Sequence, residues 1–138
     1  MTQKIEPTYV TFEQAKLLKE KGFDELTTVW RQHGNGISGD VEGKRDYYNR
    51  KGDVYVSLPE QWQVIEWLRV NHGIWINIEP EEYGQYYYVK LNVCSQELWE
   101  DLDKRHEVIT AHRKFNNEHK TPQEAYSAAF DYILNDLI

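Results

Sequence analysis

Residues 59–76, PEQWQVIEWLRVNHGIWI, change their hydrophobic period at a single glycine, and this change limits the possible folds. Before Gly73, the apolar residues within 64–68 fall in one arc of a helix. After it, residues 74–78 alternate between two faces, as in a strand with one buried side. A helix that leads directly into a strand predicts a fold in which helices and strands are mixed.

Capping signals predict two more helices. Thr11 is followed three residues later by Gln14, which forms a capping-box pattern and predicts a helix over 11–21. Near the end of the chain, Thr121 and Glu124 form the same pattern, with a proline at the first helical position. The residues that follow place alanine and aromatic side chains on one face, which is typical of a buried helix.

The remaining regular segments favour strands. Pro59 suits the first turn of the helix that ends before Gly73. Strands rich in β-branched and aromatic side chains are expected over 26–32, 53–58 and 86–93. Residues 74–78 and 86–93 are expected to form a hairpin. The sequence therefore predicts an α+β fold, with three or four helices packed on a small, mainly antiparallel sheet, in one domain over 1–138.

Residues 33–52 contain five of the eight glycines and little apolar periodicity. We expect a long Gly-rich loop or an irregular hairpin, and a loop of this length is often functional. The run from Gly34 to Gly39 spells G-x-G-x-x-G. However, DVEGKRD follows in place of a helix with an apolar stripe, so a dinucleotide site is not expected.

Between residues 94 and 120 the pattern leaves two arrangements open. Ser95 suits the cap of a helix whose apolar stripe would begin at Leu98. The apolar residues of 107–115 fall partly on the other side of such a helix, away from this stripe. Either the helix changes its packing partner near Glu107, or residues 107–115 form a strand.

Composition narrows the classes of function. The chain has 23 acidic and 16 basic residues, for a net charge of −7, which argues against broad binding to nucleic acid or anionic membranes. The single cysteine, Cys94, excludes an internal disulfide. The sequence shows no leader pattern and no apolar run of the ~20 residues that span a bilayer. We therefore expect a cytoplasmic protein that does not enter the membrane.

Catalytic and metal-binding patterns are incomplete. Cys94 precedes a helix cap, where a thiol is activated, but no local signature pairs it with a base. His106 opens H-E-x-x-H, yet Thr110 stands at the second ligand position. We expect no catalytic residue, no metal and no cofactor. An enzyme with a site near Cys94 or the histidines is kept as an alternative; the histidines are His33, His72, His106, His112 and His119.

Residues 44–51 carry the strongest local signal for nucleic acid. Basic side chains alternate there with stackable rings, as single-stranded nucleic acid requires. The residues are Lys44, Arg45, Arg50 and Lys51, with Tyr47 and Tyr48. Because they lie in an acidic chain, binding of single strands is an alternative function. The simpler interpretation is a solvated loop whose tyrosines fold back on the sheet.

Three segments resemble a group of small uncharacterised proteins encoded by phages, prophages and mobile elements of gut bacteria. They are VTFEQAKLLKEKGF (10–23), PEQWQVIEWLRVNHGIWI (59–76) and TPQEAYSAAFDYIL (121–134). The resemblance covers about a third of the chain and carries no chemistry. It implies an accessory protein of a phage or integrated element inside the host cell.

The leading hypothesis is a non-enzymatic protein that binds a protein partner, with a homodimer as one such arrangement. Tyrosine, tryptophan and arginine anchor protein interfaces. The candidate contact residues are Trp62, Arg69, Trp75, Tyr47 and Tyr48. In a helical projection Trp62 lies outside the core arc, near Arg69, and Trp75 points away from the apolar face of its strand. We therefore expect at least one of the two tryptophan rings to be exposed.

Overall fold

The structure, a computed structural model, describes residues 6–32, 39–93 and 119–138. Contacts divide the chain into two compact units, Met1–Gln61 and Trp62–Ile138. The described residues form three α-helices and antiparallel strands, as expected for an α+β fold. The strands make two small sheets rather than the single sheet predicted. The expectation of one domain over 1–138 stays a prediction.

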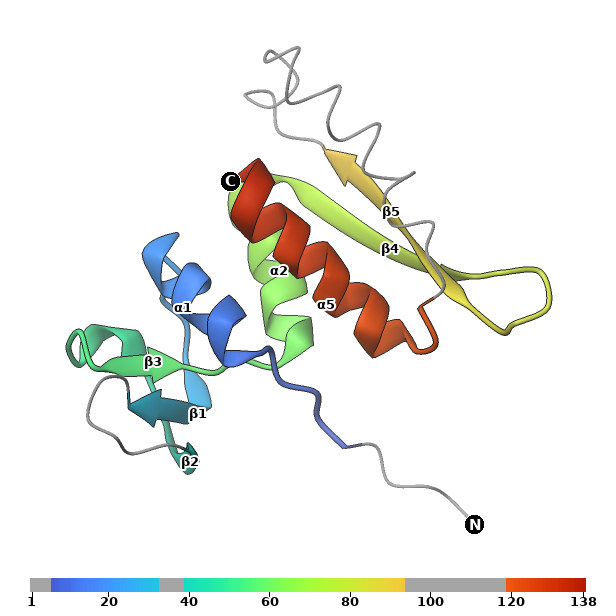
Figure 1. The fold of residues 1–138 in the computed structure, drawn as a ribbon. Helices are drawn as coiled ribbons and strands as arrows, with labels where there is room; N and C mark the ends of the chain where they lie inside the picture. The colour runs from blue at the N-terminus through green and yellow to red at the C-terminus, as the bar shows by residue number, and fades with distance from the viewer. Residues whose placement is uncertain (1–5, 33–38, 94–118) are drawn as a thin grey trace. The chain divides into compact units, whose positions relative to one another are not determined.

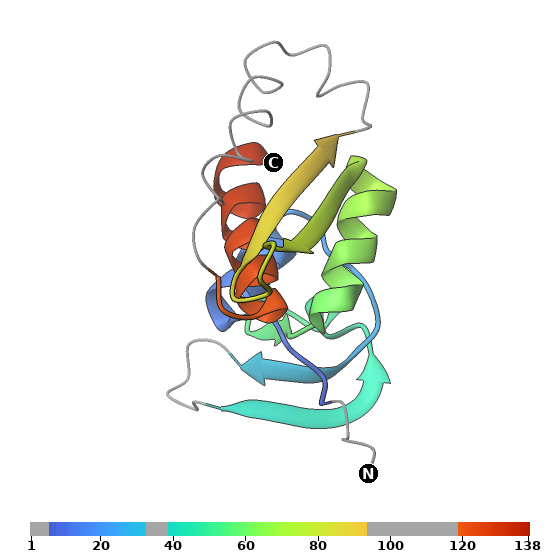
Figure 2. The same cartoon turned by 90° about the vertical axis from the view of Figure 1, so that its right-hand side faces the viewer.

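The first unit packs one helix on a three-stranded sheet of order β2-β1-β3. Its elements are α1 (Phe12–Glu20), β1 (Thr27–Gln32), β2 (Asp40–Asp46), the 3₁₀ turn η1 (Tyr48–Arg50) and β3 (Tyr55–Ser57). β1 (blue) and β2 (cyan) run in opposite directions in Figure 2. The predicted capping box of Thr11 and Gln14 is confirmed, since each side chain accepts a hydrogen bond from the other residue's backbone N–H.

Part of the Gly-rich segment 33–52 is ordered as secondary structure. From Gly39 onward it contains β2 and η1, and the pairing of β2 with β1 shifts register between Thr27 and Val29. β2 is exposed along its length up to Arg45. The first five residues of the G-x-G-x-x-G motif, Gly34 to Ser38, lie outside the described residues.

The second unit is a two-stranded hairpin with a helix against it. Its elements are α2 (Gln61–His72), β4 (Ile74–Pro80), β5 (Tyr87–Val93), α5 (Pro122–Tyr132) and the π-helical turn η2 (Ile133–Leu137). The predicted hairpin is confirmed, with Ile74 opposite Val93 and Pro80 opposite Tyr87. One hairpin face is buried through Ile74, Ile76, Val89, Leu91 and Val93. α5 lies against both strands (Figure 1).

One helix start and one capping contact differ from the sequence-based prediction. α2 begins at Gln61, not at Pro59, because Pro59 and Glu60 pair with an extended segment near the start of the chain. The N–H of Val10 donates to the Pro59 carbonyl at 3.1 Å, and Tyr9 forms a β-bridge with Glu60. At α5 the Thr121 side chain caps as predicted, but the Glu124 carboxylate accepts from the N–H of Lys120, one residue before the expected donor.

Several predictions fall on residues 33–38 and 94–118, which lie outside the described residues. They are the helix after Ser95, the choice between helix and strand over 107–115, and any role of Cys94. They also include any role of His33, His106 or His112.

Candidate functional site

Two exposed tryptophans lie on the second unit. Trp62, on the first turn of α2, is 57% exposed, and Trp75, on β4, is 46% exposed. The expectation that at least one ring is exposed is therefore confirmed for both. Glu66 and Arg69 follow Trp62 at helical spacings of four and seven residues, which places all three on one stripe of α2. Trp62, Glu66, Arg69 and Trp75 are called the tryptophan surface below.

Arg69 connects the helix stripe to the hairpin. Its guanidinium carbon lies 5.2 Å from the centre of the Trp75 ring, within the range of a cation–π contact. Its Nε and Nη2 also donate to the two carboxylate oxygens of Glu66, at 3.1 and 2.7 Å. These hydrogen bonds lower the pKa of Glu66 and raise the pKa of Arg69, so both groups are charged at neutral pH. The Glu66–Arg69 pair therefore lies beside the Trp75 ring, one to two helical turns along α2 from Trp62.

The turn between α2 and β4 determines where Trp75 lies. Gly73 has a φ of +64°, in the left-handed region that favours glycine, and it ends α2 directly before β4 begins. Alternation along β4 buries Ile74 and Ile76 and points Trp75 to the opposite face. Trp75 consequently lies next to Arg69 from the last turn of the helix. Glu66 was not among the predicted site residues, although its spacing of three from Arg69 was a usable signal.

The tyrosine candidates lie in the other unit and serve mainly in packing. Tyr48 is 7% exposed, and its ring stacks on Trp30 with centres 5.6 Å apart. Its hydroxyl donates to the backbone carbonyl of Lys44. Tyr47 is half-buried beneath the Arg50 guanidinium, 3.8 Å from its ring centre. Tyr48 therefore offers little ring surface to a partner.

Two of the four basic candidates for nucleic-acid binding are paired with carboxylates. Arg50 contacts Asp24 at 2.7 Å, and Lys51 contacts Asp46 at 2.9 Å. The hydrogen bond from Lys51 lowers the pKa of Asp46, so the carboxylate stays charged over the neutral range. Lys44 and Arg45 are exposed on β2. The positive charge of the segment is thus partly neutralised within the unit.

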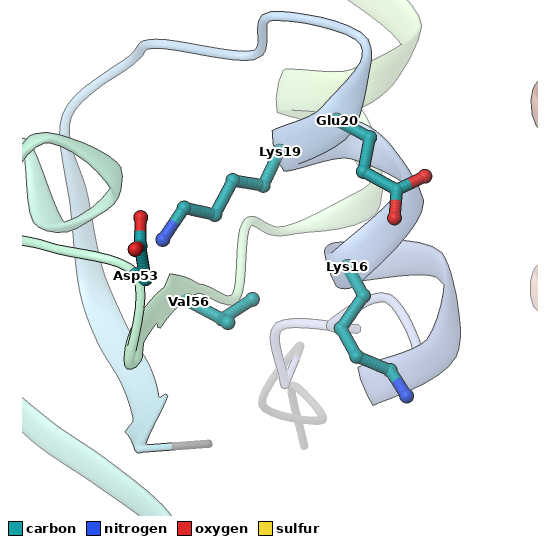
Figure 3. A pocket seen from close by; sticks show the side chains of 5 residues that line it. All are labelled: Lys16, Lys19, Glu20, Asp53 and Val56. Carbon is teal, nitrogen blue, oxygen red and sulfur yellow. The ribbon is translucent and has the colours of Figure 1, made fainter. Parts of the chain in front are cut away.

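A cavity of about 360 Å³ lies between α1 and β3 in the first unit (Figure 3). Its lining residues are Lys16, Lys19, Glu20, Asp53 and Val56. The Lys19 ammonium donates to the carbonyls of Gly52 and Tyr55 at 2.7 and 2.6 Å. Burial lowers the pKa of Lys19, and the nearby Asp53 carboxylate opposes this shift. The lysine therefore ties α1 to the turn before β3, a contact the sequence did not signal.

Replacing Lys19 with methionine is expected to destabilise the protein by about 1–2 kcal/mol, because two carbonyls lose a charged donor. Urea unfolding followed by circular dichroism measures the change. Lys44→Met, at an exposed lysine of β2, is the control and should change stability by less than ~0.5 kcal/mol. Equal stability of Lys19→Met and the wild type would show that Lys19 does not clamp the turn.

Among the residues described, no group of three or more His, Cys, Asp or Glu side chains could hold a metal ion. Over the same part of the chain, no helix has the length and apolar character needed to cross a membrane. Comparison with protein-family models, curated proteins and solved structures finds no match to this chain.

Proposed function

We propose that this chain is a non-enzymatic accessory protein of a phage or prophage that acts in the host cytoplasm by binding a protein partner. The observation that carries the proposal is the tryptophan surface, where two rings are each about half exposed and an oriented arginine lies over one of them, Trp75. Tryptophan and arginine are the residue types that most often dominate binding energy at protein interfaces.

The physical form of the surface supports protein binding over the alternatives. The Glu66–Arg69 pair is neutral overall, and Lys90 on the same hairpin is paired with Glu79 at 3.0 Å. A net-neutral surface with large rings favours a protein over a phosphate backbone, which requires uncompensated positive charge. Binding of single strands by residues 44–51 has less support, because Tyr48 is buried and Arg50 and Lys51 are paired.

Photo-crosslinking in the host cell tests the proposal. A benzophenone side chain introduced as Trp62→p-benzoylphenylalanine is expected to form a covalent product with a protein that covers the surface. Trp75→Ala in the same chain should reduce the yield about 10-fold or more, since it removes the second anchor.

The matched control places the same benzophenone at Tyr83, which is 80% exposed in the turn between β4 and β5. Exposure alone would give products at both positions, whereas a specific surface gives a product at position 62 only. Absence of any product at position 62 would contradict the proposed function.

A further inference from the structure

We infer that a second copy of this chain binds the tryptophan surface, with the two α2 helices packed antiparallel about a twofold axis. The inference rests on the proposed function, binding to a protein partner, and identifies that partner as a second copy of the chain. A twofold interface brings the same patch of both copies together, so each residue must suit its symmetry mate. The tryptophan surface meets this requirement in its charge and in the levels of its rings along α2.

Charge complementarity is the first argument. Place the axis at the middle of α2, between Trp67 and Leu68 in the sequence. Glu66 of one copy then faces Arg69 of the second copy, and Arg69 faces the second copy's Glu66. The carboxylate and the guanidinium already lie side by side within each chain, at 2.7 Å. Dimerisation would therefore bring two ion pairs together in a cluster with no net charge, in which each carboxylate has a guanidinium of the second copy at its own level along the helix.

The positions of the rings are the second argument. Trp62 precedes the axis by about 8 Å along the helix, at a rise of about 1.5 Å per residue. In an antiparallel pair this level corresponds to Gly73 of the second copy, where α2 ends and Trp75 begins to project. Each Trp62 ring is thereby placed over the Arg69–Trp75 contact of the other copy. One arrangement covers all four exposed rings.

Exposed apolar surface beside the stripe adds to the contact. Val70 is 67% exposed on the flank of Trp62 and Glu66. One helix face with a neighbouring ring makes a small interface, below the ~800 Å² per partner of a standard one. We therefore expect a reversible dimer with a dissociation constant in the micromolar range.

Two single charge reversals test the arrangement. Glu66→Arg makes both members of each of the two facing pairs basic, and Arg69→Glu makes both members of each pair acidic. Each variant alone should sediment as a monomer, with dimerisation weakened about 10-fold or more. An equimolar mixture of the two should regain the dimer, because every acidic position then faces a basic one. Sedimentation velocity over a concentration series reads out all three samples.

The double variant Glu66→Arg/Arg69→Glu separates misfolding from lost contact. It retains opposite charges both within the helix and across the axis, so it should dimerise and keep the wild-type circular dichroism spectrum. A wild type that stays monomeric up to ~500 µM, more than enough protein for a micromolar dissociation constant, overturns the inference. A dimer unaffected by either single reversal, or a mixture that stays monomeric, overturns it as well.

The crosslinking experiment distinguishes the two proposals. A product at position 62 with another protein, together with a monomeric wild type, overturns self-pairing and leaves the proposed function standing. No product at position 62 and a monomeric wild type overturn both.

Discussion

Replacement of Phe130 by alanine is expected to lower the free energy of unfolding of the second unit by about 3–5 kcal/mol. Phe130 has no exposed surface, and it belongs to α5, which lies against both strands of the hairpin. Truncation removes the transfer free energy of the ring and leaves a cavity that its neighbours fill only in part. Because small domains have a total stability of about 5–15 kcal/mol, this is a large share of what holds the unit together.

Phe130→Leu provides the graded control. Leucine keeps most of the volume of the phenylalanine side chain, so this variant should lose less than ~1.5 kcal/mol of the free energy of unfolding. Urea unfolding measures both changes, and amide hydrogen exchange of β4 and β5 shows whether the hairpin loses protection along with α5. A Phe130→Ala protein within ~1 kcal/mol of the wild type would show that α5 does not pack on the hairpin in solution.

The sequence predicted best those elements whose signals are local. The Thr11–Gln14 capping box lies within one helical turn, and the alternation of residues 74–78 needs no distant contact. The hairpin followed from the alternation of residues 74–78 and the β-branched and aromatic composition of 86–93. A short turn separates the two segments, and Gly84 in it adopts a φ of +69°. In each case the side chains that determine the backbone conformation are only a few residues apart.

Features that depend on distant residues were not predictable. Pro59 looks like a first helical residue, but its carbonyl accepts the N–H of Val10, 49 positions earlier. That long-range contact moves the start of α2 to Gln61. The division of the strands into two sheets has the same origin, because strand propensity does not specify which strands will pair.

The candidate site was predicted only in part, because some of its contacts also depend on residues that are not neighbours in the sequence. Helical projection and strand alternation indicated that Trp62 and Trp75 leave the core, since each pattern is local. The contact between Arg69 and Trp75 depends on the angle at which β4 leaves the Gly73 turn, and no periodicity reports this angle. Burial of Tyr48 likewise depends on Trp30, 18 residues before it.

Tyr48→Ala is the second change with a large expected effect, a loss of about 3–4 kcal/mol from the stability of the first unit. The ring is 7% exposed and stacks on Trp30, which also contacts Tyr55 with ring centres 5.2 Å apart. Truncation would open a cavity beside Trp30 and remove the hydrogen bond from the tyrosine hydroxyl to the Lys44 carbonyl. Near-UV circular dichroism should also lose the signal of the stacked rings.

Tyr48→Phe separates the ring from its hydroxyl. This variant keeps the ring stacked on Trp30. Its free energy of unfolding should fall by only about 1 kcal/mol, the net contribution of one hydrogen bond. The comparison also decides between the two roles assigned to residues 44–51. A Tyr48→Ala protein as stable as the wild type would mean that the ring is free to stack on bases, and binding to single strands would then have to be measured at low salt. A large loss of stability instead identifies the ring as core, because a side chain needed for folding has no exposed face left for a base.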